Sequence, residues 1–299
     1  MKIKLVTFAC IIGIIIIFPG CKFDKTGEDK SAPAEDILTL DDLEGEPEIL
    51  EDILFLFPSP GEIVDGFFNS ELEYKPGLVN SVENLDSYLG SRSQALNLGI
   101  YVADLAYLAK FEISGESVDY LEAVQSLSTQ VGISTEIFES LLERAKANIN
   151  NPDTILAISN EAFYKMFTFL ETSKKESTLA IISTGAYIES LYLVLETKSE
   201  FAENDAVFEQ ITEMKYPFDN LLSRAREHKD DKNVESICKY LNAINQTFDS
   251  LSKEETETIV TRNEGQLTIG GGTKFILTEE YFNKLKSTIH SFRTEITSI

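Results

Sequence analysis

Apolar residues recur every three or four positions through most of the chain after residue 58. This spacing is typical of amphipathic helices, and local start and stop signals set their limits. We expect a first helix that opens at Ser59 and further helices near 84–110, 116–131, 135–149, 152–172, 175–198, 203–227, 231–258 and 278–297. Eight to nine helices predict an all-α multi-helix bundle, formed by one helical domain over residues 58–299.

The helix limits rest on residues with defined capping roles. Ser59, Pro60 and Glu62 fit the N-cap, N1 and N3 positions of a capping box. Asn151 and Pro152 fit the N-cap and N1 positions of the helix near 152–172, and Gly132 fits a position just past a helix end. These signals agree with the apolar spacing around them.

One C-terminal segment breaks the helical pattern. Gln266–Ile269 and Thr273–Leu277 alternate with period two on either side of Gly270-Gly271-Gly272. This pattern predicts a small β-hairpin that turns at the glycines. A glycine-rich phosphate loop is the alternative, but Gly271 stands where such a loop needs lysine followed by Ser or Thr.

Internal repeats would change the predicted architecture. Leu98-Gly99-Ile100-Tyr101 loosely resembles the spacing of a tetratricopeptide repeat, but no copy follows one period later. A bundle with solenoid-like helical hairpins therefore stays open as the alternative to a plain bundle.

Residues 1–21 have the pattern of a lipoprotein signal. Lys2 and Lys4 precede an apolar run over 5–18, which is shorter than the ~20 residues of a membrane-spanning helix. Pro19 and Gly20 then lead to Cys21, in a region that resembles a bacterial lipobox. We predict a signal peptide over residues 1–20 and lipid attachment at Cys21. Ordinary secretion and an uncleaved anchor are the alternatives.

The segment 21–57 is rich in Asp, Glu, Lys, Pro and Gly. Such a composition buries too little apolar surface to offset the entropy of ordering the chain. We predict an acidic, flexible tether. Loose Ca²⁺ binding by its acids is the alternative, although the spacing of a calcium-binding loop is absent from the sequence.

Charge and composition narrow the function classes. The 299-residue chain has a formal net charge of −24, so phosphate backbones are repelled and no nucleic acid is expected as a partner. The two histidines, His228 and His290, have no Cys or His at ligand spacing. We predict no catalytic residue, no metal and no cofactor, and an enzyme is the least favoured reading.

Two expected helices carry polar residues within apolar surroundings. In helix 93–110, Asn97, Tyr101 and Asp104 lie opposite a stripe of small residues that includes Gly99. Glu189 occupies a similar position in helix 175–198. In one reading these groups bond to one another and fix helix register, with Asp104 held by a tyrosine, Arg92 or Arg144. The alternatives are a polar ligand pocket and a catalytic carboxylate pair.

The run Gln94–Tyr107, with Tyr74–Asn80 upstream, looks like a group of all-helical lipoproteins from Bacteroidetes. The resemblance covers most of 58–297 and implies a lipoprotein of the outer membrane that faces either the periplasm or the cell surface. It carries over no activity. We therefore expect an anchored binding or scaffolding module whose partner is an envelope protein or a small molecule. A solenoid-like adaptor in an envelope complex is the alternative.

Overall fold

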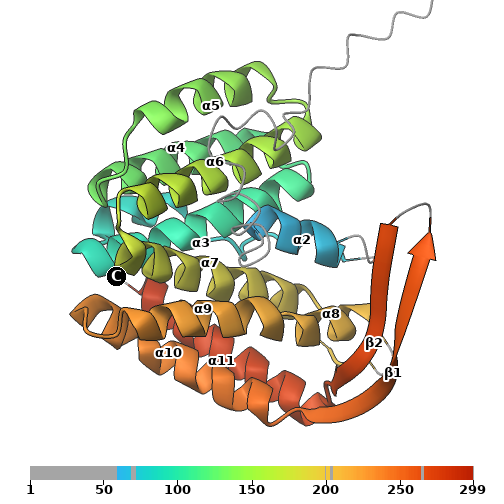
Figure 1. The fold of residues 1–299 in the computed structure, drawn as a ribbon. Helices are drawn as coiled ribbons and strands as arrows, with labels where there is room; N and C mark the ends of the chain where they lie inside the picture. Colours follow the sequence, from blue (N-terminus) through green and yellow to red (C-terminus); the bar gives the residue numbers. More distant parts are fainter. Residues whose placement is uncertain (1–58, 69–71, 199, 203–204, 264–265, 299) are drawn as a thin grey trace, which may run out of the picture. The chain divides into compact units, whose positions relative to one another are not determined.

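Helices make up most of the described chain (Figure 1). The computed structural model describes residues 59–68, 72–198, 200–202, 205–263 and 266–298, all within one unit, Ile37–Ile299. The predicted signal peptide, Cys21 and the predicted tether lie outside the described residues. The helices are α2 (Pro60–Phe68), the 3₁₀-helix η2 (Val82–Ser87), α3 (Ser91–Lys110), α4 (Ser114–Gln130), α5 (Glu136–Ala147), α6 (Pro152–Thr172), α7 (Glu176–Thr197), α8 (Ala206–Glu213), α9 (Lys215–Glu227), α10 (Lys232–Asp249) and α11 (Glu279–Thr297).

The predicted helix starts are formed by the expected side chains. At α2, the Ser59 N–H donates to Glu62 Oε2 at 2.7 Å and the Glu62 N–H donates to Ser59 Oγ at 3.1 Å, so both halves of the capping box are made. At α6, Asn151 Oδ1 accepts from the Thr154 N–H at 3.1 Å. Gly132 has a φ of 79° just after α4, as a glycine at a helix end requires.

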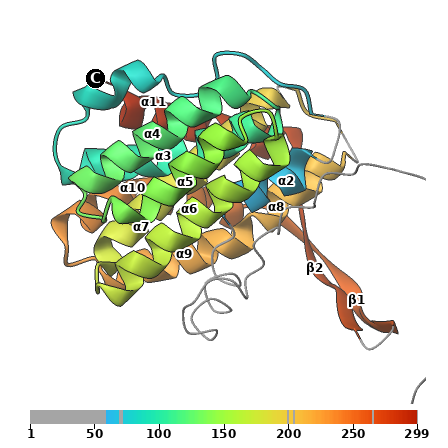
Figure 2. The same ribbon diagram turned by 90° about the horizontal axis from the view of Figure 1, so that it is seen from above.

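Helices α3 and α7 form the centre of the bundle (Figures 1 and 2). Helices α4 and α6 pack on α3, and α5 packs on both of them, while α9, α10 and α11 pack on α7. Every residue of α3 from Ala95 to Ala109 is buried. The prediction that the helix near 93–110 is central is thereby confirmed.

The two central helices touch through their backbones at glycine. An ideal Cβ on Gly99 of α3 would lie 2.0 Å from the Ile182 carbonyl oxygen of α7, and one on Gly185 would lie 2.0 Å from the Leu96 carbonyl oxygen of α3. Only glycine lets the backbones approach this closely. The stripe of small residues on α3 thus faces α7.

Helix α7 is long and apolar enough to cross a bilayer by length and composition alone. Within the domain it is instead enclosed by other helices, and 89% of its most apolar window is buried. Its hydropathy is explained by its place in the core.

Three predicted helices differ from the structure. The start of the predicted helix 84–110 is the separate 3₁₀-helix η2, and the predicted helix 203–227 is divided at Met214 into α8 and α9. The predicted helix 231–258 ends at Asp249, where the Ser250 hydroxyl bonds back to the Thr247 carbonyl. The following residues form strand β1 (Ser252–Asn263).

The β-hairpin is present, but its predicted turn was wrong. Strand β2 (Gln266–Ile276) includes the three glycines and pairs antiparallel with β1 from Ser252↔Ile276 to Asn263↔Gln266. Gly270 lies opposite Ile259 within the ladder, and the register shifts between Thr256 and Ile259. The hairpin is longer than expected because the residues before Asn263, rich in Thr, Ile and Val, supply its first strand.

Candidate functional site

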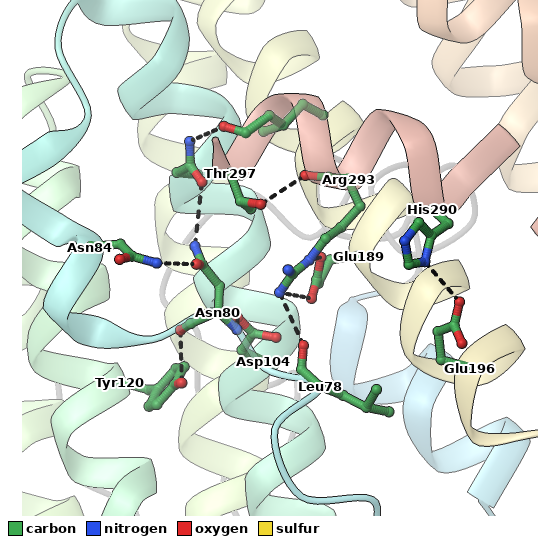
Figure 3. Close-up of polar contacts among 12 residues, drawn as sticks. Leu78, Asn80, Asn84, Asp104, Tyr120, Glu189, Glu196, His290, Arg293 and Thr297 are labelled. Atoms are coloured by element: carbon green, nitrogen blue, oxygen red, sulfur yellow. Dashed lines mark hydrogen bonds and ion pairs between the residues drawn. The ribbon is translucent and has the colours of Figure 1, made fainter. Parts of the chain in front are cut away.

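The four polar residues singled out from the sequence all lie in the core. Asn97, Tyr101 and Asp104 of α3 and Glu189 of α7 are all fully buried. Two further residues complete what we term the buried polar network: Asn80, from the loop before η2, and Arg293 of α11. Figure 3 shows Asn80, Asp104, Glu189 and Arg293 turned toward one another.

Arg293 provides the positive charge of the buried polar network. Its Nε donates to Glu189 Oε2 at 3.2 Å and its Nη2 lies 3.4 Å from Glu189 Oε1. Nη2 also donates to the Leu78 carbonyl oxygen at 3.0 Å, and the guanidinium lies 4.7 Å from the Tyr192 ring centroid. The side chain is 15% exposed, so it neutralises Glu189 with little access of water.

Asn80 joins the loop before η2 to helices α3 and α4. Its N–H donates to Asp104 Oδ2 at 3.0 Å, and its side-chain amide donates to the Tyr88 hydroxyl at 2.8 Å and lies 3.5 Å from Asn97 Oδ1. Its carbonyl oxygen accepts from the Tyr120 hydroxyl of α4 at 2.7 Å. One asparagine therefore fixes this loop against α3 and α4.

Asn97 and Tyr101 also bond to protein groups. The Asn97 amide donates to the carbonyl oxygens of Ser93 at 3.0 Å and Ile296 at 3.1 Å, and the Tyr101 hydroxyl donates to the Ser81 carbonyl at 2.8 Å. These bonds tie the end of α11 and the start of η2 to the middle of α3. They fix the mutual register of these elements.

Asp104 Oδ1 is the exception, since it is buried without a donor. Among the ionisable groups, Glu189 raises the pKa of Asp104 most, and the two carboxyl groups lie within hydrogen-bonding reach of each other. Two carboxylates cannot bond to each other without a proton. A proton on Asp104 Oδ1 makes it the donor to Glu189 and removes the unsatisfied atom. We therefore assign the neutral form to Asp104 and the ionised form, paired with Arg293, to Glu189.

The electrostatics of the site agree with this assignment. Complete burial raises the pKa of Asp104 well above its ordinary value, and the Glu189 carboxylate raises it further, while Arg293 opposes both. Burial also raises the pKa of Glu189, but Arg293 and the bond with Asp104 lower it. The proton therefore stays on Asp104. Arg144, which the sequence suggested as a partner of Asp104, instead pairs with Glu161 at 2.5 Å.

Asp104→Asn should leave the free energy of unfolding within about 1 kcal/mol of wild type at pH 7, because an amide can donate to Glu189 and accept from the Asn80 N–H as neutral Asp104 does. If Asp104 were ionised, the same substitution would instead remove a charge-assisted hydrogen bond and lower the free energy of unfolding by about 1–3 kcal/mol. Urea unfolding measures the difference. As a control, Asp104→Leu leaves Glu189 and the Asn80 N–H without this partner, so it should lower the free energy of unfolding more than Asp104→Asn does.

The same variant has a pH signature. Because the pKa of Asp104 is raised in the folded state, its contribution to stability is complete below its unfolded pKa of about 3.9 and is lost as pH rises through the folded value. Wild type should therefore gain stability relative to Asp104→Asn as pH is lowered from neutral. Parallel stability curves for the two proteins would contradict a neutral Asp104.

A cleft lies at the base of the β-hairpin, away from the network. This hairpin cleft has a volume of about 540 Å³ and is lined by Phe201, Ala202, Asp205, Phe208, Glu209, Glu254, Lys274, Phe275, Ile276, Leu277, Thr278 and Glu279. Phe201 stacks on Phe208 with ring centroids 4.8 Å apart. Sequence patterns did not indicate this site, because it joins residues that lie far apart along the chain and a region that was partly predicted as helix.

The rim of the hairpin cleft is acidic. Glu209 pairs with Lys274 at 2.6 Å, and Asp205 pairs with Lys198 from the end of α7. Glu254 and Glu279 are exposed and form no ion pair with any described residue. The cleft therefore presents uncompensated negative charge beside an aromatic wall.

No protein-family model, curated protein or solved structure matches this chain.

A second hollow runs along α11. It is shallow, with a volume of about 590 Å³, and is lined by Glu196, Asn283, Lys286, Ser287, His290, Ser291 and Thr294. His290 Nδ1 lies 3.0 Å from Glu196 Oε1, outside the buried polar network (Figure 3). Neither this hollow nor the hairpin cleft is lined by a network residue.

The described residues contain no group of three His, Cys, Asp or Glu side chains arranged to hold a metal ion. Cys238 of α10 is a free, partly buried thiol, and burial raises its pKa.

Proposed function

We propose that this protein is a lipid-anchored binding module of the bacterial cell envelope that recognises its partner through the hairpin cleft. The observation that carries the proposal is the cleft itself. Its volume of about 540 Å³ lies within the range of roughly 300–1,000 Å³ for binding sites, and it combines an apolar wall with a charged rim.

The N-terminal sequence supports the anchored part of this function. Residues 1–20 have the features of a signal peptide and Cys21 those of an acylated cysteine. Two or more acyl chains give stable membrane attachment. Charge alone would not hold the protein at an anionic surface, because its net charge is −24. The segment 21–57 would then join the helical domain to the outer membrane.

The buried polar network supports a scaffolding role inside the domain. Its hydrogen bonds run between elements of the same chain, and neither large hollow opens onto it. Buried polar groups that are satisfied in this way specify one packing arrangement. We therefore assign recognition to the hairpin cleft and structural support to the network.

A photo-crosslinking residue at position 276 should give one discrete product in the native envelope, because Ile276 lines the cleft and is 38% exposed. Position 89 is the matched control, since Leu89 is 83% exposed and lies outside the cleft lining. The mass of the product separates a protein partner from a small molecule. No product at 276, or the same products at both positions, would overturn the proposed function.

A further inference from the structure

The chemistry of the hairpin cleft specifies a class of partner. We propose that the cleft binds an extended, basic peptide segment with alternating apolar side chains. This partner class rests on the function proposed above. Three features of the described residues lead to it: the apolar wall, the two acids without an ion pair and the strand β2, which pairs with one described strand.

The apolar wall is a block of aromatic rings. Phe208 contacts Phe201 at 4.8 Å and Phe282 of α11 at 5.2 Å between ring centroids. Phe282 is fully buried, so the block is anchored in the core. Ile276 faces this hollow as one of the few large apolar side chains of the described chain that are exposed. A partner that covers it needs apolar side chains of its own.

The charge of the cleft favours a cationic partner. Four carboxylates line it, from Asp205, Glu209, Glu254 and Glu279, against the single lysine Lys274. Because Lys274 pairs with Glu209 and Lys198 pairs with Asp205, Glu254 and Glu279 are the two lining acids that form no ion pair with a described residue. The net charge of −24 adds long-range attraction for a basic ligand and repels anionic lipid headgroups.

The backbone of β2 adds a way to hold an extended chain. Residues 274–277 line the cleft, and β1 is the only strand that pairs with β2 in the described sheet. Helix α8 contacts β2, but no described strand pairs with its second edge. A strand edge without a strand partner presents N–H and C=O groups, to which an extended peptide can add. Alternate side chains of such a peptide point to opposite faces. Apolar residues would then meet the aromatic block, and basic residues would meet the acids.

The test measures the binding of short synthetic peptides to the purified full-length protein. A peptide that alternates lysine and leucine should bind. The same peptide with glutamate for lysine, or with serine for leucine, should bind at least tenfold more weakly. Binding of the Lys/Leu peptide should also weaken as salt is raised, because exposed charges are screened.

Paired variants connect the binding to the cleft. Glu254→Gln with Glu279→Gln should lower the affinity for the Lys/Leu peptide roughly threefold to tenfold, as expected for the loss of two exposed charge pairs. The matched control is Glu83→Gln with Glu143→Gln, which removes the same charge from exposed positions outside the cleft and should leave affinity unchanged. Thermal melting of both variants shows that each is folded.

Equal binding of the Lys/Leu and Glu/Leu peptides, or equal losses in the two double variants, would overturn the partner class. The proposed function fails separately. If position 276 crosslinks a defined partner in the envelope and the Lys/Leu peptide does not bind, the cleft is a binding site for another class of ligand. If position 276 crosslinks nothing, the proposed function itself is wrong.

Discussion

Gly99→Ala should lower the free energy of unfolding by about 3 kcal/mol or more, at the upper end of overpacking effects. The added Cβ would lie 2.0 Å from the Ile182 carbonyl oxygen and 2.5 Å from the Ala186 nitrogen. Both are backbone atoms of α7, so relief requires the central helices to separate. Gly99→Leu should be worse. Urea unfolding monitored by circular dichroism measures the loss.

Gly66→Ala in α2 is the matched control for this prediction. Gly66 is also helical, but a Cβ there would meet nothing within 4 Å. Alanine has the higher helix propensity, so this variant should gain about 0.5–1 kcal/mol. If Gly99→Ala is as stable as Gly66→Ala, the close contact between α3 and α7 is wrong.

Arg293→Met should destabilise the protein by about 3–5 kcal/mol at pH 7, because it leaves the buried Glu189 carboxylate without its cation. The Leu78 carbonyl oxygen loses a donor as well. Protonation of Glu189 would relieve the unpaired charge. Loss of the arginine raises the folded pKa of Glu189 further above its unfolded value of about 4.3, so the variant loses stability as pH rises. The stability difference from wild type should therefore be smaller at pH 5 than at pH 7.

Lys146→Met serves as the control for loss of an ion pair. Lys146 lies 2.7 Å from Glu122 and is 57% exposed, so its removal should change stability by less than about 1 kcal/mol. Adding Glu189→Leu to Arg293→Met should recover part of the loss, because no buried charge then remains. An Arg293→Met variant no less stable than Lys146→Met would show that Glu189 is not held by Arg293.

Helix limits were predictable where the signal is local. The predicted helix 152–172 has the bounds of α6, since Asn151 caps it and Pro152 occupies its first turn. The capping box at Ser59 was predictable for the same reason. Strand β1 was not, because its stability depends on pairing with β2, and a window that ends before Gln266 contains no partner.

The candidate site was predictable only in part. Helical periodicity places Asp104 and Glu189 on polar faces of two apolar helices, but contact between the faces depends on how α3 and α7 cross. Arg293 was missed because its helix also carries exposed charged residues, among which sequence spacing does not single it out. The hairpin cleft was missed because it forms only when β2, α8 and the start of α11 come together.

The division between a structural network and a recognition cleft is tested most directly by crosslinking from position 276 in the Asp104→Asn variant. We expect the same product, in wild-type yield, because Asp104 lies in the buried polar network and outside the cleft lining. A folded Asp104→Asn protein that loses this product would contradict the division, since the buried polar network would then take part in recognition.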